Sequence, residues 1–286
     1  MGLWFEDSII RGFRMPTLTF VETHRYNYPV PTVQSGPQYG STALTITRLN
    51  GDIALAFLTQ TQYDDEVVYL KPCCDIEFMR HVTPPGRHQI SGMGFNPITG
   101  NIWCGSHLDP DRLLVFAFEP GTGQQTLSRD LTGIASGFSG QGFATNGLFM
   151  ARGSYETMEL FGMGGAKVGE KTYSGRRITG ISASPWSWTF VDEMTNEIVV
   201  INPFGQEIAT APGVGSAGGM AAIAFDTLSE AEFMPQLYDA TNCNLGDPGT
   251  LYHYDTDWSP TPWHFRHRIY VANNVDQLIY AGYLTA

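Results

Sequence analysis

Two short acidic clusters carry side chains that could hold a metal ion. His107, Asp109 and Asp111 stand within five residues of one another in the stretch HLDPD. Imidazole and carboxylate groups are ligands that divalent cations accept, so His107 and Asp109 are candidate metal ligands. Because Asp109 precedes Pro110, a solvated turn is the alternative. Asp64-Asp65-Glu66 could bind calcium weakly, but it lacks the alternating spacing of a calcium loop and fits a hairpin tip.

A third cluster, near the C-terminus, combines aromatic rings with polar side chains. Its members are Tyr252, His253, Tyr254, Asp255, Trp258 and Trp263. Along a strand, alternation would place Tyr252 and Tyr254 on one face and His253 and Asp255 on the other. Rings that stack beside acids that accept hydrogen bonds are typical of a carbohydrate or protein contact surface. We therefore predict a binding site here, while packing of one sheet on its neighbour remains the alternative.

Motifs for nucleophilic catalysis are missing from the sequence. Residues 133–137 read GIASG, in which the serine is shifted by one position from a nucleophile elbow. We therefore predict no catalytic residues. The four cysteines, Cys73, Cys74, Cys104 and Cys243, lack the paired spacing of a zinc site and are interpreted as buried thiols. The state of the adjacent pair Cys73-Cys74 stays open, since a vicinal disulfide is possible there.

Composition limits the partners of the chain. Of 286 residues, 42% are hydrophobic and 15% charged, and the net charge is −12. Phosphate backbones and anionic lipids attract cationic surfaces, so we expect no nucleic-acid partner. No apolar run reaches the roughly 20 residues of a membrane helix, so no membrane insertion is expected. Residues 1–16 contain Glu6 and Asp7, which argues against a signal peptide.

The elements that must position these side chains come from a repeat. Residues 91–95 read SGMGF and residues 139–143 read SGQGF. Weaker copies begin at Thr179 and Gly219, and Thr45 precedes a similar apolar run. The unit starts therefore fall near residues 45, 91, 139, 179 and 219. Intervals of 20–50 residues are typical of repeat folds.

Each unit contains short segments with alternating apolar residues. The second unit predicts strands over 90–95, 101–106, 113–118 and 125–131, and the fourth over 178–183, 188–192, 197–202 and 206–211. Gly, Pro or Asn follows most of these segments, as antiparallel meanders require. No window has helical apolar spacing free of Gly and Pro. The sequence thus predicts an all-β protein.

A four-stranded meander cannot bury both of its faces alone, and radial stacking of such sheets gives a β-propeller. Small residues near the unit starts would leave space at a central channel; they are Gly92, Gly94, Gly140, Gly142, Gly180 and Gly219. We predict six blades, with N- and C-terminal strands sharing the closing blade. Residues 1–40 then contribute to that blade, and residues 41–286 hold the repeats. A five-bladed ring with residues 1–38 as an N-terminal arm is the alternative.

Residues 190–205, FVDEMTNEIVVINPFG, resemble a repeat of the NHL and gluconolactonase-like β-propellers. Those repeats read V-x-D, then Asn, an apolar strand and an Asp/Asn-Pro-x-Gly turn. The resemblance is good in this unit and loose in the second, where Cys104-Gly105-Ser106 replaces the acidic residue. It implies a possible divalent cation such as calcium, with Asp192 as a candidate ligand. An Asp that bonds backbone amides in a β-turn is the alternative interpretation of Asp192.

We expect a non-enzymatic binding or structural module. The leading hypothesis is a virion component, such as a bacteriophage tail or head appendage that assembles in the host cytoplasm and binds other proteins of that assembly or a surface glycan. Such a module would be oligomeric or docked. A sensor propeller in a bacterial cytoplasm is one alternative. The other is the metal-dependent lactone or ester hydrolase that the resemblance implies.

Overall fold

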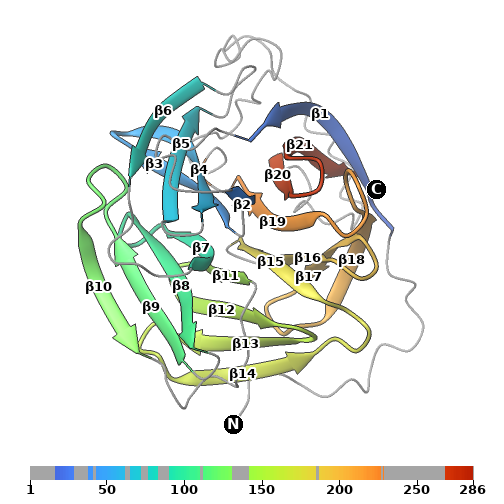
Figure 1. Ribbon diagram of the computed structural model, residues 1–286. Coiled ribbons are helices and arrows are strands. Elements are labelled where there is room, and N and C mark those ends of the chain that lie inside the picture. Colours follow the sequence, from blue (N-terminus) through green and yellow to red (C-terminus); the bar gives the residue numbers. More distant parts are fainter. Residues whose placement is uncertain are drawn as a thin grey trace, which may run out of the picture.

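Five antiparallel sheets are arranged around a common centre in the computed structural model (Figure 1). The model describes residues 17–28, 38–40, 43–61, 65–71, 77–82, 90–109, 112–130, 142–184, 187–226, 228 and 268–285. In these ranges no helix is long and apolar enough to cross a membrane. The fold is a β-propeller with four-stranded blades, as the repeat predicts.

The blades follow one another in sequence. The first contains β3 (Leu44–Leu49), β4 (Asp52–Thr61), β5 (Asp65–Lys71) and β6 (Glu77–Val82), with β2 (Gln38–Gly40) also paired to β4. The second contains β7 (Ile90–Asn96), β8 (Asn101–Asp109), β9 (Arg112–Phe118) and β10 (Gln125–Asp130). The third contains β11 (Gly142–Thr145), β12 (Phe149–Ser154), β13 (Thr157–Gly162) and β14 (Lys167–Thr172). The fourth contains β15 (Ile178–Ala183), β16 (Trp188–Asp192), β17 (Glu197–Ile201) and β18 (Glu207–Pro212). The fifth contains β19 (Met220–Phe225), β20 (Arg268–Asn273), β21 (Leu278–Thr285) and β1 (Thr19–Asn27).

Apolar side chains of neighbouring blades form the core. Five buried clusters occur among the described residues, and each joins two adjacent blades. The cluster that closes the ring packs Leu55 and Phe57 of the first blade against Tyr270 and Ile279 of the fifth. Both faces of a blade are therefore covered by its neighbours, which explains why single strands such as β17 are buried along almost their whole length.

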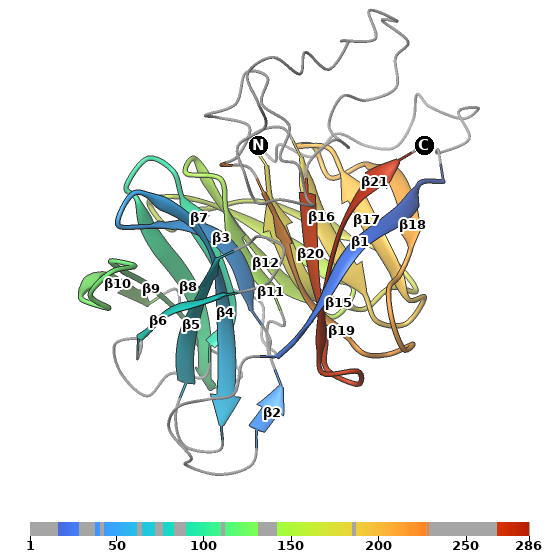
Figure 2. The ribbon, with the colours of Figure 1, turned by 90° about the horizontal axis from the view of Figure 1, so that it is seen from above.

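The closing blade corrects the predicted number of blades. β1 pairs antiparallel with β21, from Thr19 opposite Thr285 to Asn27 opposite Leu278, and the two strands lie side by side (Figure 2). The ends of the chain thus share a blade, as predicted. That blade is the fifth, because β1 supplies the outer strand that the fifth unit lacks; the prediction of six blades was wrong for the described ring. The sequence also predicts strands over 3–10 and 250–255, and these ranges lie outside the described residues.

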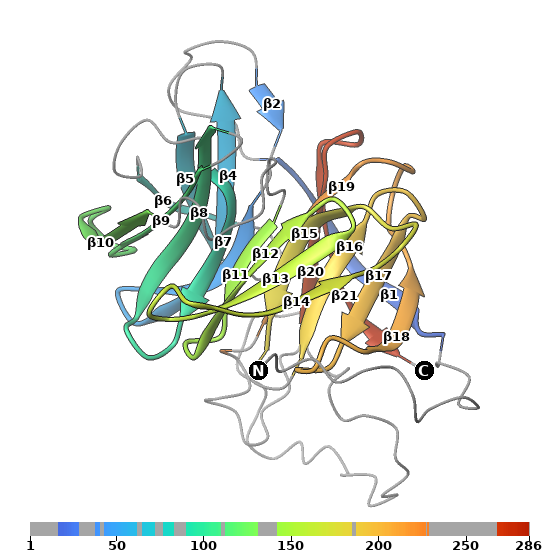
Figure 3. The same cartoon turned by 90° about the horizontal axis from the view of Figure 1, so that it is seen from below.

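The start of β1 also contacts the fourth blade. β1 lies beside β18 (Figure 3). Thr17 forms a parallel bridge with Thr210, and the Leu18 N–H donates to the Thr210 carbonyl at 2.6 Å. The Leu18 side chain is 1% exposed and packs among residues of the fourth and fifth blades. The same segment therefore completes one blade and fastens it to the next.

Candidate functional site

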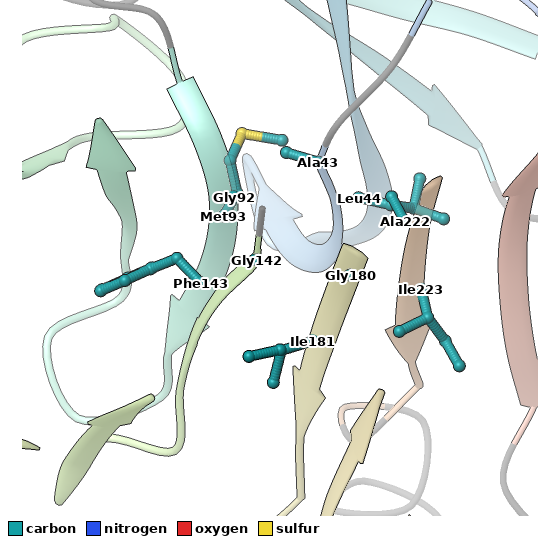
Figure 4. A pocket seen from close by; sticks show the side chains of 10 residues that line it. All are labelled: Ala43, Leu44, Gly92, Met93, Gly142, Phe143, Gly180, Ile181, Ala222 and Ile223. Atoms are coloured by element: carbon teal, nitrogen blue, oxygen red, sulfur yellow. The ribbon is translucent and has the colours of Figure 1, made fainter. Parts of the chain in front are cut away.

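The centre of the ring is filled by backbone rather than open. Each innermost strand places a small residue there, followed by a larger one that packs between blades; the pairs are Ala43-Leu44, Gly92-Met93, Gly142-Phe143, Gly180-Ile181 and Ala222-Ile223 (Figure 4). A Cβ atom on Gly92 would lie 2.1 Å from the Phe143 backbone nitrogen. At this level the enclosed volume is about 0 Å³. The expected central channel is thus closed here, and the glycines let the strands touch.

Beyond this closed level the axis widens into a pocket of about 140 Å³, which we call the axial pocket. It lies at the end of the ring where the innermost strands finish. Its described lining is Thr45, Ile46, Met93, Gly94, Phe95, Pro97, Ala144, Thr145, Asn146, Ser182, Ala183, Ser184, Phe225 and Leu228. These side chains offer hydroxyl, amide and apolar groups.

Asp192, the candidate ligand from the resemblance, lies at the opposite end of the ring, at the end of β16. Its side chain is fully buried. Oδ1 accepts hydrogen bonds from the Arg177 and Met194 N–H groups at 2.8 and 3.0 Å. Oδ2 accepts from the Thr195 hydroxyl at 2.6 Å and from Arg176 Nη1 at 3.1 Å. Burial alone would raise the pKa of Asp192, but these hydrogen bonds outweigh it and hold the pKa below 3.8.

Arg176 ties this end of the fourth blade together. Its guanidinium donates to Glu207 through Nε and Nη2, at 3.0 and 2.8 Å, and to Glu197 through Nη1 at 2.8 Å. With Asp192, three carboxylates therefore share one cation. Two-point pairing of a guanidinium with a carboxylate fixes geometry as well as charge, so this network stiffens the β16–β17 hairpin. Among the described residues, no group of three or more His, Cys, Asp or Glu side chains is arranged to hold a metal ion.

Hairpins of three successive blades expose apolar side chains at this same end. Tyr155 lies between β12 and β13, Met194 between β16 and β17, and Val275 between β20 and β21. Their exposed fractions are 49%, 67% and 62%. We call these three residues the hairpin-tip surface.

Short contacts link the three tips. Arg177 lies over the Tyr155 ring at 5.8 Å and pairs with Glu193, the neighbour of Met194, at 3.0 Å. On the other side, the Gly213 N–H donates to the Asn196 carbonyl at 2.7 Å. Asn273 then donates through Nδ2 to the Val214 and Ser216 carbonyls, while its Oδ1 accepts from the Val275 N–H. The hairpin-tip surface thus rests on a continuous polar network.

The structure separates the sequence-predicted site residues. The backbones of His107 and Asp109 lie on β8, in the second blade, whereas Asp192 belongs to the fourth, so the third blade stands between them. The side chains of His107 and Asp109 are outside the described part. So are all residues of the C-terminal cluster: Tyr252, His253, Tyr254, Asp255, Trp258 and Trp263. The same holds for Cys73 and Cys74, while Cys104 is a buried free thiol whose pKa burial raises.

Sequence reasoning did not single out the axial pocket. Its signal was present in the repeat, because alignment of the unit starts places Thr45, Gly94, Ala144, Ser182 and Ala224 at one position. At this position some blades carry a side-chain hydroxyl and others carry only glycine or alanine. The variation indicates that the hydrogen-bond partners of the innermost strands differ from blade to blade.

Comparison with known proteins supports the fold. The chain is similar in structure to glutaminyl cyclase from Myxococcus xanthus, with a TM-score of 0.58 and 11% identity over 95% of this chain and 98% of that one. This likeness is one of fold. Virginiamycin B lyase from Staphylococcus aureus gives a TM-score of 0.44 and 14% identity over 91% of this chain and 69% of that one. No family model and no curated protein matches the sequence.

Proposed function

We propose that the chain is a non-enzymatic binding or structural module that docks onto another protein of a larger assembly through the hairpin-tip surface. One observation carries the proposal: Tyr155, Met194 and Val275 are exposed on adjacent blades, and hydrogen bonds fix the backbone beneath them. Exposed apolar residues scattered singly are ordinary, but a linked set on a rigid base is typical of an interaction site.

The charge of the chain favours one kind of partner. With a net charge of −12, the protein attracts basic surfaces and repels acidic ones. The partner we propose therefore presents an apolar patch with a basic rim. Because the tips are held in place before binding, docking would order few side chains, which lowers its entropic cost.

The setting we propose is a virion, in which the chain is a structural or host-attachment component. Composition supports this setting: lysines are few, with only Lys71, Lys167 and Lys171, and aromatic residues make up 13% of the chain. A sensor propeller in a bacterial cytoplasm would use the same surface with a different partner.

The enzymatic alternative is a metal-dependent lactone hydrolase of the NHL and gluconolactonase-like kind. Such an enzyme needs carboxylates that can bind a metal, whereas the Asp192 oxygens already accept four hydrogen bonds. The described lining of the axial pocket can bind but supplies no general acid or base at neutral pH. Hydrolysis of a simple lactone, measured with and without chelator beside the metal content, distinguishes the two functions. Stoichiometric metal with chelator-sensitive turnover would overturn the binding proposal.

The docking proposal is tested by footprinting in the assembled state. Particles purified from the organism that carries the gene should contain the chain at a fixed copy number. Hydroxyl radicals should then oxidise Met194 at least fivefold more slowly in particles than in the free chain. Leu148, which is 64% exposed at the other end of the ring, is the control and should react equally in both.

A matched pair of variants adds a second readout. Met194→Asp should prevent incorporation into particles, because it places a charge in the apolar contact, whereas Leu148→Asp should be incorporated normally. Absence of the chain from particles would overturn the virion setting. Equal oxidation of Met194 in both states would overturn the docking surface.

A further inference from the structure

The axial pocket is large enough for a small molecule. A water occupies roughly 30 Å³ in the liquid, so 140 Å³ corresponds to roughly five waters. All five blades contribute residues to the lining, so the shape of the pocket is fixed by the packing of the blades around the ring. The pocket lies at the end of the ring opposite the hairpin-tip surface, so a ligand bound in it would be independent of the proposed docking function.

Backbone N–H groups point toward the axis at the level where this pocket begins. In an antiparallel pair, alternate residues bond to the partner strand and those between them face the other way. The Phe95 N–H faces inward and donates to the Thr45 hydroxyl of the preceding blade at 3.1 Å. The Phe225 N–H donates in the same way to Ser182 Oγ at 2.9 Å. A hydroxyl from one blade thus caps an inward N–H of the next.

Among the described residues, three of the five equivalent N–H groups have no such cap, those of Ile46, Thr145 and Ala183. The last two belong to adjacent blades. Thr145 and Ala183 occupy the position of Phe95 and Phe225 in the third and fourth blades. Their neighbouring N–H groups do bond within the hairpin, since the Asn146 N–H donates to Phe149 at 3.2 Å and the Ser184 N–H to Ser187 at 2.8 Å. By alternation, the N–H groups of Thr145 and Ala183 face inward.

The residues opposite them carry no side-chain acceptor. Gly94 stands where Thr45 would offer its hydroxyl, and a Cβ atom there would already lie 2.5 Å from the Thr145 nitrogen. Ala144 stands opposite Ala183. All four residues line the pocket. Two backbone donors on adjacent strands therefore face one cavity, and a buried donor without an acceptor destabilises the fold.

The rest of the lining limits what could accept these hydrogen bonds. Among the described lining residues none is charged, so a neutral oxygen suits the site better than an anion. Asn146 Oδ1 already accepts from the Leu148 and Phe149 N–H groups, which leaves its amide NH₂ as a further donor. Apolar contacts come from Met93, Phe95, Pro97, Phe225 and Leu228.

We propose that the axial pocket binds an uncharged small molecule with an acetamido group, such as an N-acetylated amino sugar, free or at the end of a glycan. The amide carbonyl accepts from the Thr145 and Ala183 N–H groups. The methyl group contacts the apolar lining, and a sugar hydroxyl accepts from the Asn146 amide. A carbonyl oxygen has two lone pairs, so it can satisfy two donors at once.

Saturation-transfer NMR and calorimetry with N-acetylglucosamine test the proposal on the full chain. We expect saturable binding, with the strongest saturation transfer to the acetyl methyl group. Glucose is the matched control, since it lacks the acetamido group, and should bind at least tenfold more weakly. No saturable binding of N-acetylglucosamine, or equal binding of glucose, would overturn the proposal.

Two variants place the ligand. Ala144→Ser supplies the hydroxyl that Ser182 and Thr45 supply in their blades, so it should cap the Ala183 N–H and weaken N-acetylglucosamine binding at least fivefold without lowering the melting temperature. Ala183→Leu fills the pocket and should abolish binding. Gly164→Ala, which adds a methyl group in open space, is the control and should bind like the wild type. Unchanged affinity in both pocket variants would show that the sugar binds elsewhere and would refute the assignment.

Discussion

Substitution of Gly92 by alanine should open the centre of the ring. The new Cβ atom would lie 2.1 Å from the Phe143 nitrogen and 2.8 Å from its Cα, and both are backbone atoms that no rotamer change can move. Since real Cβ contacts stay beyond 3.0 Å, β7 and β11 must separate by at least 0.9 Å, the difference between 3.0 and 2.1 Å. Overpacking of this kind costs about 3 kcal/mol or more when backbone must yield.

The assay is thermal unfolding of Gly92→Ala beside Gly164→Ala. A loss of about 3 kcal/mol lowers the melting temperature of a domain of this size by roughly 5 °C or more. A Cβ atom on Gly164 meets nothing within 4 Å, so Gly164→Ala should melt within about 1 °C of the wild type. If both variants melt together, the close approach of the innermost strands is refuted, and with it the closed axis.

Three further changes probe other parts of the molecule. Ser182→Ala leaves the buried Phe225 N–H without its acceptor and should cost about 1–3 kcal/mol in chemical denaturation; an unchanged midpoint would show that this cap is dispensable. Asp192→Asn removes a carboxylate whose pKa lies below 3.8, so the stability it contributes is present above about pH 4 and lost as the pH falls through the lowered pKa. The melting temperature of the wild type should therefore fall more steeply below pH 4 than that of the variant, and parallel profiles would contradict this. Leu18→Ala removes a side chain that is 1% exposed and should cost about 2–4 kcal/mol while speeding proteolysis near residue 17; wild-type protection would contradict the fastening role.

The repeat was readable because the same local chemistry recurs in every blade. The fourth unit is the clearest case: strands at Ile178–Ala183 and Trp188–Asp192 were predicted with the bounds that the structure has. Turn residues fixed these limits, as at Asn196, whose φ of 54° is the left-handed conformation that asparagine tolerates. The alternation of apolar residues and the choice of turn residues depend only on positions close together in the chain. They can therefore be recognised in a single sequence.

The number of blades depends on contacts that are not local. β1 and β21 are separated by almost the whole chain, and the sequence of β1 (Thr19–Asn27) does not indicate which blade this strand joins. The fifth unit looked long enough to be followed by another, because after a long insertion the sequence predicts strands over 250–255 and 264–271, with residues 275–284 remaining. Only the packing of Phe57 against the fifth blade shows that the ring is already closed.

The candidate site was harder to predict than the fold. Asp192 was recognised by its motif, and its four hydrogen bonds are those of a turn-binding aspartate. The hydrogen-bonding character of the axial pocket depends on which innermost residues lack a side-chain hydroxyl, as Ala144 does. The sequence shows that Ala144 has no hydroxyl, but only the structure shows that it stands opposite the Ala183 N–H.

The pairing of β1 with β21 has a consequence for synthesis. β1 has no partner until β21 leaves the ribosome, so the ring stays open while all the residues between these two strands are translated. During that interval the apolar edges of the first and fifth blades have nothing to cover them. The emerging chain should therefore depend on chaperones until β21 is free, and a premature stop just before Leu278 would release a ring that cannot close.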